Sequence, residues 1–152
     1  MTVRTVSEFM TRDVVAVSPE TALDTVAATL TKHRISGAPV VDAQGKAVGV
    51  VSLADIVDPE RHSSESKGFP IVYYIEDGMA TPSIEGAEFR KGRAEDVMTP
   101  LPFTIEASAP ITEAAAVMVE NRIHRLLVVE SDALVGIVST LDLLRGFVDA
   151  NA

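Results

Sequence analysis

Apolar residues at helical spacing alternate with short β-branched runs along most of the chain, which predicts a mixed α+β fold. One run has the i, i+3, i+4, i+7 spacing of a buried helix face: Leu23, Val26, Ala27 and Leu30. The preceding Ser18-Pro19 pair predicts that this helix begins there, with Ser18 as the N-cap and the proline in the first turn. The β-branched run at 14–17 predicts a short strand before the helix.

A strand–turn–strand pattern follows the predicted helix. The apolar runs at 39–41 and 47–51 flank a turn at 43–46 that contains glycine, which is typical of a β-hairpin. After Ser52 the apolar spacing becomes helical again. A short helical turn is expected at 5–10, where Thr-x-x-Glu is a capping signature. The pattern therefore predicts a unit with the element order β-α-β-β-α, preceded by a short helix.

The same order of elements occurs a second time. Met10-Thr11 recurs as Met98-Thr99, 88 positions later, and Ser52 recurs as Ser139, 87 positions later. The second helix face is expected to bury Ile111, Ala114, Ala115 and Met118. Repeats of about 50 residues are marginal alone, so we expect the two to pack against each other about a pseudo-two-fold axis.

These repeats divide the chain into residues 1–57, a linker at 58–92, and residues 93–152. The linker matches nothing in the repeats, and its charged, Ser-rich part at 58–68 predicts an exposed loop. The apolar, aromatic run at 69–75 predicts an additional strand lying over the core, with a lid or a partner-facing surface as alternatives.

Composition excludes several classes of function. A net charge of −9 argues against nucleic acid as the main partner and against anionic membranes, although local cations can still hold a small anion. Because the chain has no cysteine, disulfides, Cys-ligated zinc and thiol catalysis are excluded. We see no signal peptide or membrane-spanning run, which makes the cytoplasm the expected compartment.

A Gly-x-x-Ser-x-x-Asp motif occurs once in each repeat, at residues 49–55 and 136–142. In each copy a strand is expected to run into a helix N-terminus, where free N–H groups favour a phosphate or a ribose. The same motif is also related to the capping box, in which the Ser and the acidic residue satisfy the helix start. Both interpretations remain open at this point.

The ordered set of motifs resembles a tandem pair of CBS domains, the Bateman module. The resemblance rests on the two Met-Thr pairs, the blocks 33–42 and 122–130, and both Gly-x-x-Ser-x-x-Asp motifs. It covers nearly everything except the linker. It implies that AMP, ADP, ATP or S-adenosylmethionine binds between the two repeats, with no further cofactor.

The resemblance implies two quasi-equivalent ligand sites. In the first, Asp142 would hold the ribose hydroxyls and Ser139 the ribose or phosphate. The other residues implied for this site are Thr11, Ala16, Ser36, Pro39, His124 and Arg125. The second site would consist of Ser52, Asp55, Thr99, Thr104 and Leu127. Thr104 stands where the first site has the smaller Ala16, which would crowd the adenine.

The two sites are expected to differ in strength, because His124-Arg125 stands where the first repeat has Ser36-Gly37. In nucleotide-sensing members of the family a His-Arg pair at this position contacts phosphate. Arg offers a forked donor, and His adds charge when protonated. The Asp142 site is therefore favoured. The alternative is that Arg125 pairs with a surface carboxylate and His124 is merely solvated.

Other conspicuous side chains have simpler interpretations. Arg34 and Arg122 occupy equivalent positions at predicted helix ends, where a cation complements the helix dipole. His33 is expected at the surface, and Met10 and Met98 are expected to fill the core.

The sequence thus predicts a regulatory, non-catalytic protein that senses an adenosine ligand and modulates an unidentified partner. A dimerisation or interaction scaffold with an empty cleft is the alternative. No catalytic residues and no metal ligands are assigned, because thiols, a phosphate-binding glycine loop and a His–carboxylate group are missing from the sequence. A homodimer is expected by analogy with the family.

Overall fold

The computed structural model describes residues 2–57, 72–76, 79–83 and 89–150. The chain forms two compact units. The C-terminal unit consists of Met1–Val14, Ala43–Ala47 and Leu101–Ala152, and the central unit of Val15–Asp42 and Val48–Pro100. Each unit thus takes residues from both repeats. Within the described ranges, no helix is long and apolar enough to cross a membrane.

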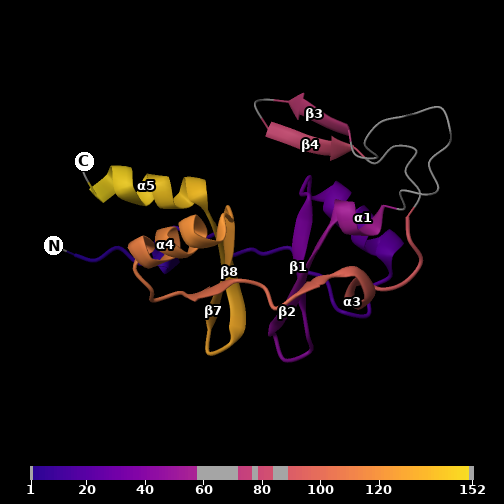
Figure 1. Ribbon diagram of the computed structural model, residues 1–152, viewed down its shortest axis with the longest axis horizontal. Helices are drawn as coiled ribbons and strands as arrows, with labels where there is room; N and C mark the ends of the chain where they lie inside the picture. The colour runs from indigo at the N-terminus through magenta and orange to yellow at the C-terminus, as the bar shows by residue number, and fades with distance from the viewer. Residues whose placement is uncertain (1, 58–71, 77–78, 84–88, 151–152) are drawn as a thin grey trace. The chain divides into compact units, whose positions relative to one another are not determined.

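The C-terminal unit is built on a three-stranded sheet in the order β6-β7-β8 (Figure 1). Strand β6 (Thr104–Glu106) runs parallel to β7 (Arg125–Glu130), and β7 pairs antiparallel with β8 (Ala133–Ser139). Ser131 and Asp132 connect β7 to β8, and both have positive φ, 49° and 66°. Positive φ at both central residues is the pattern of a type I′ turn, whose twist suits a hairpin.

Two helices pack beside this sheet. Helices α4 (Ile111–Asn121) and α5 (Thr140–Ala150) contact each other, and they lie together on one side of β7 and β8 (Figure 1). The core includes the predicted helix positions Ile111, Ala114 and Met118, with Ala115 partly buried against it. This predicted buried face is confirmed.

The central unit repeats the plan with shorter elements. Its sheet has the order β1-β2-β5, formed by β1 (Gly37–Val41), β2 (Ala47–Ser52) and β5 (Thr99–Pro100). Its helices are α1 (Leu23–Lys32), α2 (Leu53–Ile56) and α3 (Ala94–Val97). The four predicted positions on α1 are all buried, with Leu30 at 0% exposure. The strand predicted at 14–17 is reduced to one parallel bridge between Val17 and Val40.

The predicted start of α1 at Ser18-Pro19 is wrong. The helix begins at Leu23, because Ser18 closes a turn instead: its N–H donates to Thr21 Oγ1 at 3.1 Å, and its carbonyl accepts the Thr21 N–H at 3.1 Å. Ala22 then pairs as an extended residue with Arg93. Ser and Thr favour such local bonds over helix, which explains the later start.

The leading segment of each repeat joins the unit that carries the other repeat's sheet. Val6 of the short 3-10 helix η1 (Val6–Glu8) and Met10 are buried in the core of the C-terminal unit, while Ala94 is buried in the central unit and Met98 packs against its core. The predicted capping bond is present, since the Thr5 N–H donates to the Glu8 carboxylate at 2.8 Å. Met10 is a core side chain, as predicted, and Met98 is partly buried against the other core.

The linker contributes a two-stranded antiparallel sheet formed by β3 (Val72–Glu76) and β4 (Met79–Ser83). The strand predicted within 69–75 is therefore found from Val72 onward. Residues 69–71 and the loop predicted at 58–68 lie outside the described residues.

Candidate functional site

The start of α5 shows what the Gly-x-x-Ser-x-x-Asp motif does locally. The N–H and the hydroxyl of Ser139 both donate to Asp142 Oδ2, at 2.8 Å and 2.9 Å. The Asp142 N–H donates in return to Ser139 Oγ at 3.2 Å. The capping interpretation of this motif is thus realised in full. The other carboxylate oxygen, Oδ1, has no hydrogen-bond partner among the described residues.

The same arrangement recurs at the predicted weaker site and at a helix start that belongs to neither predicted site. In the central unit the N–H and hydroxyl of Ser52 donate to Asp55 Oδ2 at 2.8 Å and 3.0 Å. At the start of α3 the N–H of Arg93 donates to Asp96 Oδ2 at 2.8 Å. An aspartate that reaches back to the helix start therefore does not by itself indicate a site. If Asp142 differs from Asp55 and Asp96 in function, the difference has to come from the residues around it.

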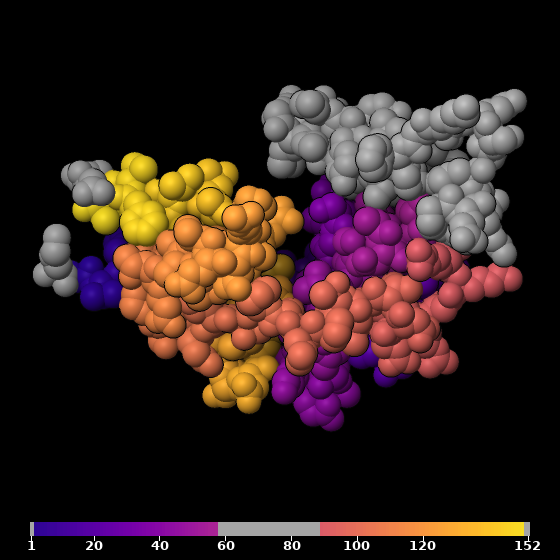
Figure 2. Space-filling view, in the orientation of Figure 1, coloured from indigo at the N-terminus to yellow at the C-terminus, as the bar shows by residue number. Residues whose placement is uncertain are grey.

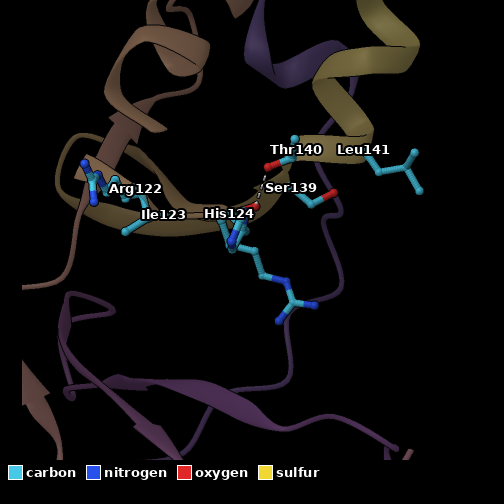
Figure 3. A pocket seen from close by; sticks show the side chains of 7 residues that line it. Arg122, Ile123, His124, Ser139, Thr140 and Leu141 are labelled. Atoms are coloured by element: carbon cyan, nitrogen blue, oxygen red, sulfur yellow. Dashed lines mark hydrogen bonds between the residues drawn. The ribbon is translucent and has the colours of Figure 1, made fainter. Parts of the chain in front are cut away.

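The surroundings of α5 form an open pocket of about 750 Å³ at the beginning of β7 and of α5 (Figure 3). It is lined by Arg122, Ile123, His124, Arg125, Ser139, Thr140 and Leu141. The backbone N–H of Thr140 donates to the His124 carbonyl at 2.9 Å, and its hydroxyl donates to the same oxygen at 3.2 Å. These bonds fasten the segment before β7 to the start of α5, while Arg125 pairs with Ser139 across the two strands.

Three of the lining side chains are basic, and all three are exposed: Arg122, His124 and Arg125. Their side chains make no hydrogen bond or ion pair within the part of the chain that the structure describes. Elsewhere in this unit, Arg4 and Glu8 form an ion pair at 3.3 Å. The alternative in which Arg125 pairs with a surface carboxylate is therefore not found there. A chain of net charge −9 thus places two arginines without ion-pair partners at this pocket, beside His124.

The residues predicted for the favoured site fall into both units. His124, Arg125, Ser139 and Asp142 belong to the C-terminal unit, as does Thr11. The Thr11 N–H donates to the Ile137 carbonyl at 2.8 Å, and the Ile137 N–H donates back at 2.9 Å, which places Thr11 beside the strand that leads into Ser139. The remaining residues of this prediction are in the central unit: Ala16, Ser36 and Pro39, of which Pro39 is buried.

The second predicted site is divided in the same way. Ser52, Asp55 and Thr99 lie in the central unit, where Thr99 pairs with Val50 of β2. Thr104 and Leu127 lie in the C-terminal unit and face each other as a parallel pair between β6 and β7. Thr104 is exposed, whereas Leu127 is 7% exposed and offers little surface.

The sequence prediction missed four residues that line the pocket: Arg122, Ile123, Thr140 and Leu141. Thr140 and Leu141 separate Ser139 from Asp142, so their position in the motif could have identified them. Arg122 was interpreted as a helix-end cation. The sequence did place Arg122 two residues before His124, which could have identified it as a residue of the same site.

The comparison with known families decides what kind of protein this is. The family model for the CBS domain matches two segments, residues 6–59 and 94–149. The chain belongs to the CBS domain family. The predicted resemblance to a tandem CBS pair and the predicted α+β fold class are thereby confirmed.

Individual CBS proteins resemble most of the chain. CBSX1, a chloroplastic CBS domain-containing protein of Arabidopsis thaliana, is 34% identical over 94% of this chain, which spans 64% of that relative's length. The uncharacterized protein MJ1426 of Methanocaldococcus jannaschii is 34% identical over 77% of this chain and 76% of its own length. A crystal structure of CBSX2 in complex with AMP has a TM-score of 0.68 and 29% identity, and covers 97% of this chain and 98% of that one.

Proposed function

We propose that this CBS pair is a regulatory protein that binds an adenosine-containing ligand: AMP, ADP, ATP or S-adenosylmethionine. The observation that carries the proposal is the pocket at the start of α5, where His124 and Arg125 are free to meet an anion beside Ser139. The crystallisation of the related CBSX2 with AMP supports an adenosine ligand.

Each residue of the favoured site has a role in this proposal. Asp142 uses Oδ2 for the helix start and Oδ1 to accept a hydrogen bond from a ribose hydroxyl, so that one carboxylate serves both purposes. Arg125 meets a phosphate with its forked donors, and His124 adds charge when it is protonated. Thr11, Ala16, Ser36 and Pro39 remain predictions for this site, and Ser52, Asp55, Thr99, Thr104 and Leu127 remain predictions for a weaker second one.

Regulation would follow from a difference in affinity. A ligand shifts an equilibrium between two states only by as much as it binds one state better than the other. The partner that receives this signal is a protein that interacts with the ligand-bound form more strongly or more weakly than with the free form. A homodimer in the cytoplasm remains our prediction.

A scaffold function is the second candidate, and one observation favours it. Helix α5 exposes Leu141, Leu144 and Val148, which are 59%, 53% and 67% exposed and recur at helical spacing. This helix lies at the surface of the C-terminal unit, in yellow in Figure 2. Apolar side chains gathered on one helix are typical of a protein contact. Such a contact is compatible with ligand binding and would not require it.

Calorimetric titration with AMP, ADP, ATP and S-adenosylmethionine separates the two functions. We expect the wild type to bind at least one of them. Asp142→Asn keeps an oxygen for the Ser139 N–H but introduces an amide, and we expect it to weaken binding by roughly 10- to 150-fold, the equivalent of about 1.5–3 kcal/mol. Its free energy of unfolding should fall by about 1 kcal/mol or less, because the helix start is only weakened.

Asp55→Asn is the matched control, because Asp55 makes the same bonds to Ser52. It should lose as much stability as Asp142→Asn while the tighter binding event stays unchanged. Failure of the wild type to bind any of the four compounds at millimolar concentration would leave the scaffold function as the better account. Equal losses of affinity in the two variants would contradict the assignment of the stronger site to Asp142.

A further inference from the structure

Arg122 lines the pocket but has no part in the proposed roles. It ends helix α4 in the left-handed conformation, with φ 54° and ψ 42°. Helices that end in this way mostly use glycine, because a Cβ is unfavourable there. The helix end itself is closed by backbone bonds: the Arg122 N–H donates to Val119 at 3.4 Å and the Ile123 N–H to Met118 at 3.0 Å. A glycine would make these bonds with less strain, so the turn does not require the arginine side chain.

The position of Arg122 suggests what the side chain is for. In Figure 3 Arg122 lies at the opposite end of the labelled residues from Leu141, with His124 and Ser139 between them. The guanidinium is exposed and makes no ion pair within the described ranges. A ligand that begins with its ribose at Asp142 and has its first phosphate at His124 and Arg125 would extend toward Arg122 with any further phosphate.

We propose that Arg122 contacts the second or third phosphate of the ligand, so that this site selects nucleoside di- and triphosphates over monophosphates. The inference rests on the proposed function and names the ligand class of the same site. Each additional phosphate brings negative charge and acceptor oxygens that suit a guanidinium fork. In the absence of a ligand, Arg122 and Arg125 have no anion among the described residues to neutralise them. A polyphosphate supplies the missing charge, whereas a monophosphate reaches only His124 and Arg125.

The test compares AMP, ADP and ATP by calorimetric titration in buffer with EDTA, so that no divalent metal screens the phosphates. For the wild type we expect ADP or ATP to bind about 10-fold or more tightly than AMP, the factor typical of one charged hydrogen bond. Arg122→Gly should reduce this ratio to about 1 and change the affinity for AMP less than 3-fold. Arg122→Lys, which keeps a positive charge, should retain part of the ratio.

Arg34→Gly is the matched control for the backbone. Arg34 also has φ 54° and follows the end of α1, but it belongs to the central unit and does not line this pocket. Arg122→Gly should melt at or above the wild-type temperature, because glycine relieves the left-handed strain. Arg34→Gly should leave the ATP to AMP ratio of the tighter site unchanged.

The outcomes separate this inference from the proposed function. If the wild type binds none of the three nucleotides, the nucleotide function itself fails. If the wild type binds AMP as tightly as ATP, or if Arg122→Gly keeps the wild-type ratio, the role of Arg122 is wrong while nucleotide binding stands. A loss of AMP and ATP affinity by the same factor would make Arg122 a general anchor and would also contradict the selectivity.

Discussion

Replacing Gly136 by alanine tests how the leading segment of the chain is packed against β8. A Cβ added at Gly136 would lie 2.6 Å from Met10 Sδ and 2.9 Å from the Thr11 carbonyl oxygen. The thioether belongs to a flexible side chain and can move. The carbonyl is held by the Ile137 N–H at 2.9 Å, so the strand pairing has to shift or that bond has to lengthen. Both responses destabilise the C-terminal unit.

The size of the effect follows from the kind of contact. Forcing extra atoms into a well-packed site costs about 1–3 kcal/mol. For a chain of this length each kcal/mol lowers the melting temperature by roughly 2–4 °C. Scanning calorimetry or urea unfolding of Gly136→Ala should therefore show a melting temperature about 2–12 °C below that of the wild type. Gly49→Ala should behave alike, since its Cβ would lie 2.6 Å from Met98 Sδ and 2.9 Å from the Thr99 carbonyl oxygen.

A double-mutant cycle identifies the cause. Met10→Ala opens space where the new Cβ has to go, so Met10→Ala and Gly136→Ala together should cost about 0.5–3 kcal/mol less than the sum of the two single changes. Met98→Ala with Gly136→Ala is the control, because Met98 packs in the other unit; their costs should add. If the first pair is additive, or if Gly136→Ala unfolds like the wild type, Met10 and Thr11 do not pack against Gly136 as described.

Two further substitutions test the core and a turn. Leu30→Ala removes a side chain that is 0% exposed in the core of the central unit, so urea unfolding should show a loss of about 2–5 kcal/mol; a loss below 1 kcal/mol would contradict that burial. Ser131→Gly relieves a positive φ of 49° in the β7–β8 turn and should raise the free energy of unfolding by up to about 1 kcal/mol; a lower stability would show that the Ser131 side chain supports the turn.

The sequence predicted the elements well where periodicity was clear. Helices α1 and α4 bury the positions expected from their spacing, and both hairpins lie where glycine or a short polar turn separates β-branched runs. The predicted start of α1 was wrong because a serine such as Ser18 can act either as an N-cap or as a turn residue. Its hydroxyl bonds to Thr21 Oγ1 at 2.8 Å, and no local pattern shows that Thr21 will compete for it.

Long-range pairing was harder to predict than local structure. The repeat pattern divided the chain into residues 1–57 and 93–152 but did not show which sheet each leading segment joins. The backbone sends each leading segment to the other repeat's sheet: the Arg4 carbonyl accepts the Ile111 N–H at 3.0 Å, and the Gly92 carbonyl accepts the Leu23 N–H at 3.1 Å. These bonds satisfy the starts of α4 and α1, which lack side-chain caps. The sequence predicted Ser18 as the cap of α1, and it did not show that backbone carbonyls from distant segments would satisfy these helix starts.

The glycine, serine and aspartate of the repeated motif can now be explained without a ligand. Gly136 leaves room for Met10 and Thr11 beside β8, and Ser139 and Asp142 satisfy the helix that follows. The same physical demands exist at Gly49, Ser52 and Asp55. Recurrence of the motif is therefore a consequence of the fold and carries little information about binding.

The residues that do not recur between the repeats are the ones that indicate a binding site. In the first repeat the place of Arg125 is taken by Gly37, where a Cβ would lie 3.1 Å from the Val51 carbonyl oxygen, and the place of His124 is taken by Ser36. The second repeat thus has a long cationic side chain at a position where the first repeat has a tightly packed glycine. In the second repeat this side chain lines the pocket at the start of α5. Since folding explains the shared positions in both repeats, the departure at His124 and Arg125 is what the proposed function has to explain, and a phosphate bound by these two side chains would explain it.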